Sequence, residues 1–586
     1  MTGEATDVVV LGSGVGGLTA ALVAARAGLS VIVLEHLDKI GGTSARSSGT
    51  VWIPANHYLA AAGVEGDAEA ARTYLNALGG DRVDPAITDA FIKSAPVMLK
   101  ELCDGEGLSF RPFMTAPDYR QDHPGAAPGG RALEPAPFDG RTLGADFARL
   151  AEPLPELMVF GGMMVTRSEA ARLLTADRSA GAAALGARMV ARYARDRLRH
   201  HRGTRLVLGN ALVARLLRAC RDRGVVVRTG VSAERLLTRG RAVTGVAGTA
   251  NGAPFEIATS RAIILAGGGF PANPEWRARE MPQPTPKATP ASPGADGSTL
   301  ALAEAAGAAL GPAGSDNAMW FPSSFATRPD GSTAVWPHIV LDRSKPGLIA
   351  VDGTGRRFTN EAVSYHEFVR AMYRAHEAGR AAVPAYLIAD RAFIKRYGLG
   401  LIRPRTPRLA PYVARGYLIE AADIAALAGK IDVPAEILEA TVARYNAFAA
   451  DGVDRDFHKG ETIYDRSNGD QAVAPNPCVG PIKTAPFYAV AVWPTPLGTS
   501  RGLAADTNAR VLDAAGAPIP GLYACGGDMQ SAFGGEYPGA GAQLGQAMTF
   551  AWLAARHAAG TNLSADTPAD LPRNMTTDAR GGAEWH

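Results

Sequence analysis

Apolar runs alternate with polar and glycine-containing segments along the N-terminal part of the chain. Residues 8–11 (VVVL) are β-branched or apolar and predict a short, buried strand. After a cluster of glycines, an Ala- and Leu-rich stretch predicts a helix that ends near Gly28. A second apolar run, residues 31–34, predicts another strand, with Glu35 directly after it. The pattern is therefore typical of a β–α–β unit.

The glycines between the first strand and the helix have the spacing of a dinucleotide-binding turn: Gly12, Gly14 and Gly17. Gly12 permits a tight turn, Gly14 lets a pyrophosphate approach the backbone, and Gly17 lets helix and strand pack closely. The N–H groups at the helix N-terminus would face the phosphates, and Glu35 would bind the adenosine ribose. A glycine turn in an ordinary α/β protein is the alternative, but it leaves Glu35 unexplained.

A Gly- and Ser-rich segment, residues 39–56, favours FAD over NAD as the dinucleotide. An NAD-binding chain normally continues into another β–α unit, and this chain does not. Backbone N–H groups and hydroxyls in the segment suit the diphosphate and the flavin ring. The expected contacts are Gly42, Thr43, Ser44, Ser48 and Gly49. Residues 37–56 contain no histidine, so we expect the flavin to be bound non-covalently.

An arginine-dense stretch, residues 188–223, has two interpretations. It could form an anion-binding face, or it could form a pair of solvated helices. Leu212, Leu216 and Cys220 place an apolar stripe among the arginines, which favours the helices. A strand should follow Gly224.

The order of the predicted elements indicates two domains, because the chain is too long for one simple core. A strand at residues 261–265 leads into a glycine turn that contains Gly267, and Pro-rich sequence at residues 271–293 marks the exit from the first domain. The predicted fold class is α/β, a Rossmann-type FAD-binding domain with an inserted α+β catalytic domain. The predicted boundaries are 1–275 and 490–562 for the two parts of the FAD-binding domain, 276–489 for the catalytic domain, and 563–586 for a C-terminal tail.

Composition and charge narrow the range of partners. The chain has 586 residues, a formal net charge of +3, 47% hydrophobic and 20% charged residues, the balance of a globular enzyme. A charge this close to neutral gives no reason to expect nucleic acid or an anionic membrane as the main partner. The four cysteines lack the spacing of a zinc or iron–sulfur site, and no apolar stretch is long enough for a transmembrane segment. We expect a cytoplasmic protein with reduced thiols and no metal.

Several motifs make the chain similar to the fumarate reductase/succinate dehydrogenase flavoprotein superfamily, and within it to the 3-ketosteroid Δ1-dehydrogenases. The matching segments are GSGVGG (12–17) with Glu35, GGTSARSSGTVWIP (41–54), GADG (294–297), RRFTNEAVSY (356–365), GLYACGGD (521–528) and EYPGAGAQLGQAMTF (536–550). They follow the same order over nearly the whole chain. The resemblance implies an FAD-dependent oxidoreductase of the kind used in steroid degradation.

Three positions favour the ketosteroid dehydrogenases over the fumarate reductases. Where fumarate reductases carry a proton-transferring arginine after the F-x-N-E motif, this chain has Tyr365. Where they carry two carboxylate-binding elements, this chain has LGTSRG (497–502) and YPGAG (537–541). Tyrosine and backbone replace cationic groups, which suits a neutral ketone. Arg501 is the one residue of these segments that could still serve an acidic substrate.

The resemblance implies a catalytic role for four residues. The Tyr537 hydroxyl and the Gly541 N–H would bind the ketone oxygen and stabilise the developing enolate. Tyr365 would accept the α-proton. A free tyrosine has a pKa near 10, so the base needs assistance, and Tyr119 in PDYRQDHPG would supply it through a hydrogen bond. The flavin would take the hydride from the β-carbon.

The same resemblance implies further contacts with the cofactor. Asp528 would bind the ribityl chain, and the helix after Leu544 would aim its positive end at the pyrimidine edge of the flavin. Val231 and Gly267 complete the predicted cofactor-binding residues.

The chain also departs from the usual pattern of this family at three points. Arg120 and Gln121 follow Tyr119, where two adjacent tyrosines before a proline are usual. Ala540 replaces a common proline, and Arg501 replaces a small residue.

We therefore expect 1,2-desaturation of a 3-ketosteroid, with a quinone-type or artificial electron acceptor. Two alternatives keep the same fold: a desaturase of a smaller cyclic ketone, and an enoate reductase like the fumarate reductases. A third alternative is a flavin-binding subunit for electron transfer or scaffolding. The missing iron–sulfur cysteine spacing argues against this third alternative.

Overall fold

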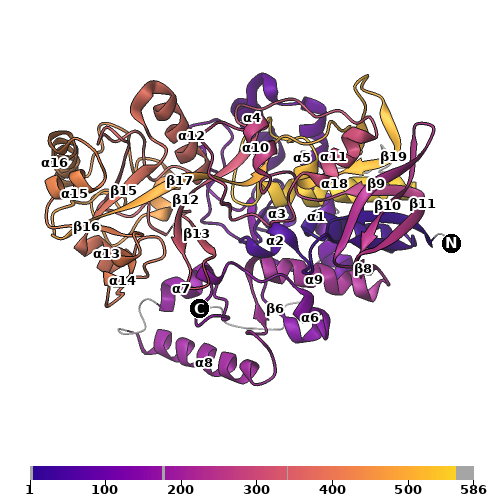
Figure 1. Cartoon of the computed structure of the whole chain (residues 1–586), viewed down its shortest axis with the longest axis horizontal. Coiled ribbons are helices and arrows are strands. Elements are labelled where there is room, and N and C mark those ends of the chain that lie inside the picture. The colour runs from indigo at the N-terminus through magenta and orange to yellow at the C-terminus, as the bar shows by residue number, and fades with distance from the viewer. Residues whose placement is uncertain (1–3, 174–178, 340, 562–586) are drawn as a thin grey trace.

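An eight-stranded sheet has the predicted β–α–β unit at its centre (Figure 1). Strands β11 (Ala253–Leu265), β1 (Glu4–Leu11), β2 (Val31–Leu34) and β8 (Val226–Arg228) pair in parallel in that order. Strand β19 (Pro518–Ala524) pairs in parallel with the far edge of β11, so the C-terminal part of the chain returns to the sheet in which the N-terminal part lies. The computed structural model describes residues 4–173, 179–339 and 341–561.

Helix α1 (Val15–Arg26) follows β1 directly, as the apolar pattern predicted. It contacts α9 (Leu208–Asp222) and α18 (Ala542–Ala559), which is why its residues from Val15 to Ala24 are buried. A Cβ atom on Gly17 would lie 2.0 Å from the carbonyl oxygen of Gly12. The start of α1 can therefore pack against the turn only because residue 17 is glycine.

A three-stranded antiparallel extension flanks the parallel strands. Strands β9 (Val231–Arg239) and β10 (Ala242–Ala250) pair antiparallel, and β10 also pairs antiparallel with β11. A small separate sheet, β3 (Val51–Trp52), β5 (Ala132–Pro135) and β4 (Phe110–Pro112), lies beside α18. Residues 113–131, which contain Tyr119, are the loop between β4 and β5 and are held at both ends by this pairing.

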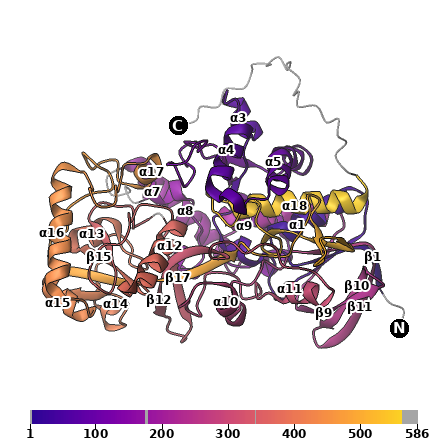
Figure 2. The same ribbon diagram turned by 90° about the horizontal axis from the view of Figure 1, so that it is seen from above.

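A six-stranded sheet forms the other half of the molecule (Figures 1 and 2). Its order is β13 (Thr333–Pro337), β12 (Ala318–Thr327), β17 (Phe487–Thr499), β15 (Ala385–Asp390) and β14 (Leu348–Val351), with β16 (Ile419–Ala421) also paired to β17. All of these pairs are antiparallel. Helix α12 (Tyr365–Ala375) packs on β12, and α15 (Ile424–Lys430) packs on α16 (Ala435–Asp451).

The mixed arrangement of helices and strands agrees with the predicted α/β class. Strand β17 spans residues 487–499, so the predicted domain boundary between residues 489 and 490 falls inside a strand. The division at residues 275 and 276 stays a prediction, as does the extent of each domain. The predicted C-terminal tail, residues 563–586, lies outside the described residues.

The arginine-dense stretch contains the two expected helices. Helix α8 (Ala180–Arg197) lies at the lower edge of the molecule in Figure 1, and most of its residues are exposed. Helix α9 is different, because Leu212, Leu216 and Cys220 are buried against the core, as the apolar stripe predicted. The strand after Gly224 is β8.

One finding concerns membranes. Within residues 4–173, 179–339 and 341–561, no helix combines the length and the apolar character that crossing a bilayer requires. The cytoplasmic location stays a prediction.

Candidate active site

A cavity of about 520 Å³ extends from the glycine turn after β1 to the starts of α12 and α18. It brings together most of the residues that the sequence predicted for the site. These are Gly12, Gly14, Glu35, Gly42, Thr43, Ser44, Ser48, Val231, Gly267, Leu544, Tyr119, Tyr365, Tyr537 and Gly541. The predicted nucleotide turn and the predicted catalytic tyrosines therefore lie on one cavity.

The backbone is open to the cavity at the glycine turn. Gly12 has a φ of +107°, and a Cβ atom there would lie 2.3 Å from the Ala266 oxygen. The N–H of Gly14 donates to no acceptor in the described part of the chain, and a Cβ atom on Gly14 would have Ser44 Oγ, at 3.4 Å, as its nearest neighbour. An unpaired N–H at a helix N-terminus beside open space fits the pyrophosphate of FAD.

Glu35 lies on the cavity wall and is almost fully buried. Its carboxylate accepts hydrogen bonds from the backbone N–H groups of Ser13 and Leu37, each at 3.0 Å, and from the Ser13 hydroxyl. These bonds fix the direction of the carboxylate at the end of β2. Two carboxylate oxygens offer about four acceptor positions, so a ribose hydroxyl can still be accommodated.

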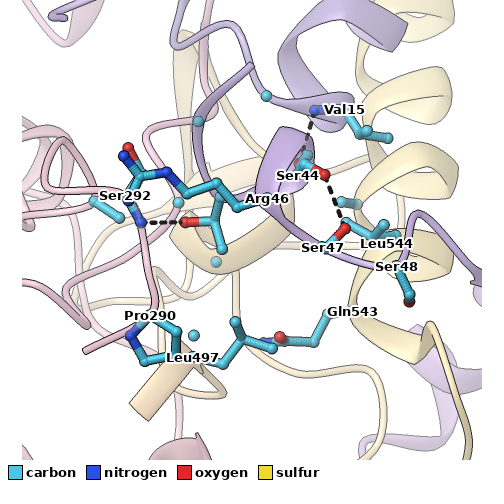
Figure 3. Close-up of a pocket in the computed structure, with 18 of the residues that line it drawn as sticks. Val15, Ser44, Arg46, Ser47, Ser48, Pro290, Ser292, Leu497, Gln543 and Leu544 are labelled. Atoms are coloured by element: carbon cyan, nitrogen blue, oxygen red, sulfur yellow. Dashed lines mark hydrogen bonds between the residues drawn. The ribbon is translucent and has the colours of Figure 1, made fainter. Parts of the chain in front are cut away.

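Helix α2 (Gly42–Arg46) forms the wall next to the glycine turn (Figure 3). The Ser44 hydroxyl accepts a hydrogen bond from the Val15 N–H at 3.1 Å and so joins α2 to the start of α1. The Thr43 hydroxyl accepts from the Ser292 N–H at 2.9 Å and joins α2 to the Pro-rich segment.

Arg46, the last residue of α2, is a cavity residue that the sequence pattern did not predict (Figure 3). Its Nη1 donates to the Ala291 oxygen at 3.3 Å, and burial lowers the pKa of its guanidinium. The sequence does show an arginine inside a segment of otherwise small residues. Nothing in the sequence indicated that this arginine faces the cavity.

Three predicted cofactor residues do not lie on the cavity wall: Gly17, Gly49 and Asp528. Gly17 has the packing role described above. Gly49 has a φ of +67°, and a Cβ atom there would lie 2.5 Å from the backbone nitrogen of Gly209. It therefore lets α9 approach the segment after α2.

Asp528 lies behind the wall and is completely buried. Its two carboxylate oxygens accept from the backbone N–H groups of Gly267, at 2.6 Å, and Gly269, at 2.8 Å. Burial raises the pKa of this carboxyl group. The structure therefore uses Asp528 to hold the glycine turn that lines the cavity, and its contact with the ribityl chain stays a prediction.

Gly541 caps the N-terminus of α18 with a φ of +91°. A Cβ atom at this position would lie 2.2 Å from the Thr50 oxygen, so no other residue fits without a shift of the backbone. Its N–H donates to no acceptor within the described ranges and lies on the cavity wall. Gln543 and Leu544, in the first turn of α18, line the cavity beside it (Figure 3). A helix N-terminus aimed at the cavity suits the electron-rich edge of a flavin.

Three tyrosines from distant parts of the chain form a buried cluster. Tyr119 comes from the loop between β4 and β5, Tyr365 is the first residue of α12, and Tyr537 precedes α18. The hydroxyl oxygens of Tyr119 and Tyr365 are 2.6 Å apart. The ring centroid of Tyr537 lies 5.4 Å from that of Tyr119 and 5.5 Å from that of Tyr365, both in edge-to-face contact. The assistance of Tyr365 by Tyr119 is thus geometrically available.

Burial controls the acidity of these hydroxyls. It raises the pKa of Tyr365 and of Tyr119 well above the usual value for tyrosine, and the negative charge of a neighbouring ionised phenol would raise both further. The pKa of Tyr537 is raised by burial too, with partial compensation from its interaction with Tyr365. All three are therefore neutral at physiological pH, and a proton acceptor among them has to be helped by its partners during the reaction.

A fourth tyrosine, Tyr464, belongs to the same cluster and was not predicted from the sequence. It lies in α17 (Ile463–Asn468), lines the cavity, and its ring centroid is 5.2 Å from that of Tyr119. Its surrounding sequence, GETIYDRSN, carries no motif, so only the folded chain identifies it.

Part of the cavity wall is apolar. Its side chains come from the segment between η2 (Gly140–Leu143) and α7 (Arg167–Leu173) and from the residues after β13. They include Leu154, Leu157, Met158, Met164, Ile339 and Leu341. This part of the cavity suits a hydrophobic molecule.

Arg501 does not lie on the cavity, which corrects the expectation that it could serve an acidic substrate. Its guanidinium forms an ion pair with Glu280, and its Nε donates to the Gly311 oxygen at 3.1 Å. The residue lies within the predicted LGTSRG segment, but β17 ends before it at Thr499, and its side chain pairs with the last residue of α10 (Pro274–Glu280).

Comparisons with known proteins agree with this geometry. The family model described as "FAD binding domain" matches residues 7–544. The 3-oxosteroid 1-dehydrogenase of Mycobacterium tuberculosis (strain ATCC 25618 / H37Rv) is 37% identical over 571 residues, which are 95% of this chain and 99% of that protein. The 4-oxocyclohexanecarboxylate 2-dehydrogenase of Sinomonas cyclohexanicum is 38% identical over 94% of this chain and 93% of that protein.

A solved structure is similar over nearly the whole fold. The 3-ketosteroid Δ1-dehydrogenase of Sterolibacterium denitrificans, crystallised in complex with 1,4-androstadiene-3,17-dione, superimposes with a TM-score of 0.89 at 37% identity. The match covers 95% of this chain and 100% of that one.

Proposed function

The chain belongs to the FAD-binding family of 3-oxosteroid 1-dehydrogenases, and from this premise we propose how its cavity introduces a double bond beside a ring ketone. It is an FAD-dependent oxidoreductase acting on a CH–CH group. The eight-stranded sheet is the Rossmann-type FAD-binding domain, and the six-stranded sheet belongs to the inserted catalytic domain. The single observation that carries the proposal is the meeting of Tyr119, Tyr365, Tyr537 and the unpaired N–H of Gly541 on one cavity.

The ketone oxygen binds between the Tyr537 hydroxyl and the Gly541 N–H. Both are donors, and both are fixed before substrate arrives, one by its packed ring and the other by the helix cap. They stabilise the negative charge that gathers on this oxygen as the α-proton leaves. The low polarity of the surrounding wall strengthens these hydrogen bonds.

Tyr365 takes the α-proton at its hydroxyl oxygen. The pair reacts in the form that has lost one phenolic proton to solvent, with the remaining proton in the 2.6 Å hydrogen bond to Tyr119, so the α-proton returns both phenols to the neutral form. The pair therefore acts as one base, because the hydrogen bond between the two oxygens spreads the negative charge of the ionised form over both. The ring of Tyr464 packs edge-to-face against that of Tyr119.

FAD would be held by the glycine turn, α2, Glu35, Val231, Gly267 and the N-terminus of α18, and when bound it would supply the acceptor for the β-hydride. The chain's own contribution is to place backbone N–H groups at the phosphates and a helix N-terminus at the flavin edge. A quinone-type acceptor would then restore the oxidised cofactor.

The substrate we propose is a 3-ketosteroid, because the apolar part of the cavity wall suits a large hydrophobic ring system. A second candidate is a smaller ring ketone that carries a carboxylate. Two observations favour it: a relative at 38% identity is named for 4-oxocyclohexanecarboxylate, and Arg46 places a cation on the cavity wall. An enoate reductase is disfavoured, since Arg501 is paired with Glu280 outside the cavity.

Anaerobic mixing of the oxidised holoenzyme with each ketone tests the proposal. We expect a 3-ketosteroid to bleach the flavin absorbance within one turnover and 4-oxocyclohexanecarboxylate to do so weakly. The reverse order would transfer the assignment to the smaller ring ketones. No bleaching by either class would overturn the proposed reaction.

A further inference from the structure

Each of the three catalytic tyrosines has a charged residue next to it, or nearly so, in the chain. Arg120 directly follows Tyr119, and Glu536 directly precedes Tyr537. Glu367 is two residues after Tyr365, in the first turn of α12. None of these charged residues lies on the cavity wall. Ion pairs instead bring them together outside the cavity.

Arg370 connects them. It lies on α12, is not one of the residues that line the cavity, and its side chain is 13% exposed. Its Nη1 is 2.5 Å from Oε2 of Glu536 and 3.1 Å from Oε1 of Glu367. The second oxygen of Glu367 lies 3.6 Å from Nη1 of Arg120. One guanidinium therefore joins, directly or through one carboxylate, the segments of all three tyrosines.

Other N–H groups of the Arg370 guanidinium also have partners. Its Nε donates to Oδ2 of Asp316 at 2.9 Å, and this oxygen also accepts from the indole N–H of Trp320 at 2.9 Å. Both oxygens of Glu536 are bound, because Arg82 pairs with Oε1 at 2.7 Å. A planar guanidinium with this many fixed partners has little freedom to move.

A second set of contacts, hydrogen bonds between uncharged groups, links the Tyr119 and Tyr537 segments. The backbone oxygen of Pro538 accepts from the Tyr119 N–H at 2.9 Å and from the Tyr74 hydroxyl at 2.8 Å. The Tyr74 hydroxyl in turn accepts from the Arg120 N–H at 3.1 Å. These hydrogen bonds fix the Tyr119 and Tyr537 segments to each other, but they do not involve α12. The ion pairs of Arg370 and Glu367 supply the missing connection to that helix.

A metal ion is the competing explanation for this cluster. Ligand atoms of His366, Glu367 and Glu536 all lie within 4.8 Å of one another, and Nε2 of the buried His366 has no partner in the described ranges. However, Arg370 and Arg82 already bind Glu536, and a cation would have to displace a guanidinium from the same carboxylate. Arginine is the better counter-charge in this geometry.

We propose that Arg370 is a positioning residue that sets the distances among the three catalytic tyrosines, acting through Glu536, Glu367 and Arg120. The inference rests on the proposed function of the tyrosines. The proposal also gives Arg120 a structural role. At this position the family usually has a tyrosine, so the chain departs from the family pattern there. An error of about 1 Å in the placement of reacting groups can reduce a rate about 100-fold, so the loss of this link should appear in turnover.

The test compares Arg370→Ala holoenzyme with wild type, using a 3-ketosteroid that bleaches the wild-type flavin. We expect kcat to fall about 100-fold, with KM changed less than about threefold, because the apolar wall that binds most of the substrate is untouched. Added guanidinium ion at millimolar concentration should restore kcat at least tenfold and in a saturable way. A purely structural defect would not respond so, since guanidinium weakens folding.

Arg380→Ala is the matched control. Arg380 lies just past α12 and pairs with the buried carboxylate of Asp352, but it touches no tyrosine segment. The Arg380→Ala variant should have a lower melting temperature and an unchanged kcat. Added guanidinium should not change its kcat.

If Arg370→Ala does not fold, Glu367→Gln keeps the test open, because it removes the link to Arg120 with little change in shape. We expect kcat to fall about tenfold with a normal melting temperature. Wild-type kcat in both variants, while wild type bleaches normally, would overturn this inference alone. Absence of bleaching in wild type would instead overturn the proposed function.

Discussion

The two ends of the cavity present different chemical groups, backbone at one end and side chains at the other. At the nucleotide end the chain presents backbone, with an unpaired N–H at Gly14 and glycines where a side chain would block the approach. At the other end it presents the side chains of Tyr119, Tyr365 and Tyr537. The glycine turn of the first end is made by neighbours in sequence, whereas the tyrosines of the second end are brought together only by the fold. Substitutions should therefore damage the two ends in different ways.

The largest expected effect is at the tyrosine end. Tyr365→Phe removes the proton acceptor and leaves the ring packing, so kcat should fall on the order of 10³-fold. FAD content, measured from the flavin absorbance of the purified protein, should stay at the wild-type level because Tyr365 is remote from the glycine turn. A variant that retains turnover would show that another group accepts the proton.

The difference between the two ends also explains what the sequence could predict. The β–α–β unit, the glycine turn and Glu35 are local, so the apolar period and the glycine spacing were sufficient to predict β1, α1 and β2. The pairing of Tyr119 with Tyr365 joins a loop to a helix far along the chain, and it was expected only through the family resemblance.

The roles of other residues could not be predicted, because each role depends on the direction in which the side chain points. The sequence does not contain that information. Arg46 and Arg501 are both arginines in small-residue segments, yet Arg46 faces the cavity and Arg501 pairs with Glu280. Asp528 follows a glycine pair, and the sequence did not indicate that the backbone N–H groups of Gly267 and Gly269 bind its carboxylate. Tyr464 has no motif at all.

Gly541→Ala tests whether backbone can matter as much as side chains at the tyrosine end. The added Cβ would lie 2.2 Å from the Thr50 oxygen at a φ of +91°, so the cap must shift and move its N–H away from the ketone oxygen. Loss of one such donor reduces kcat about 100-fold. Gly560→Ala, at the other end of α18 with a φ of +72° and no atom within 4 Å, is the control. It should cost about 1 kcal/mol of stability and leave kcat unchanged.

The pH dependence should follow the raised pKa of the tyrosine pair. Because burial raises the pKa of Tyr365 and Tyr119, the pair is protonated at neutral pH, and kcat/KM should rise about tenfold per pH unit between about pH 6 and 9. The same shift stabilises the folded state below about pH 10, where unfolded tyrosine ionises, and this stabilisation is lost as pH rises further. A flat profile from pH 6 to 9 would contradict a phenol as the base.

Gly14→Ala addresses the nucleotide end. Its backbone is extended (φ −65°, ψ 179°), which alanine adopts easily, and the nearest atom to the new Cβ is Ser44 Oγ at 3.4 Å. The apoprotein should therefore fold normally, while the methyl group occupies the approach of the pyrophosphate. We expect FAD to bind about tenfold more weakly in a fluorescence titration, a cost of about 1.4 kcal/mol. Gly28→Ala, at a φ of +85° away from the cavity, should lower stability and leave FAD affinity unchanged.

The smallest expected effect separates the two arginines. Arg501→Gln should change kcat/KM by less than about twofold for every ketone, because the side chain lies outside the cavity and Glu280 keeps a second partner in Arg279. The loss of a partly exposed ion pair should cost about 1 kcal/mol of stability. Arg46→Gln removes a cation from the wall and should weaken the binding of a carboxylate-bearing ketone more than that of a neutral steroid. If Arg501→Gln, rather than Arg46→Gln, selectively weakened the acidic ketone, the direction assigned to these two side chains would be wrong.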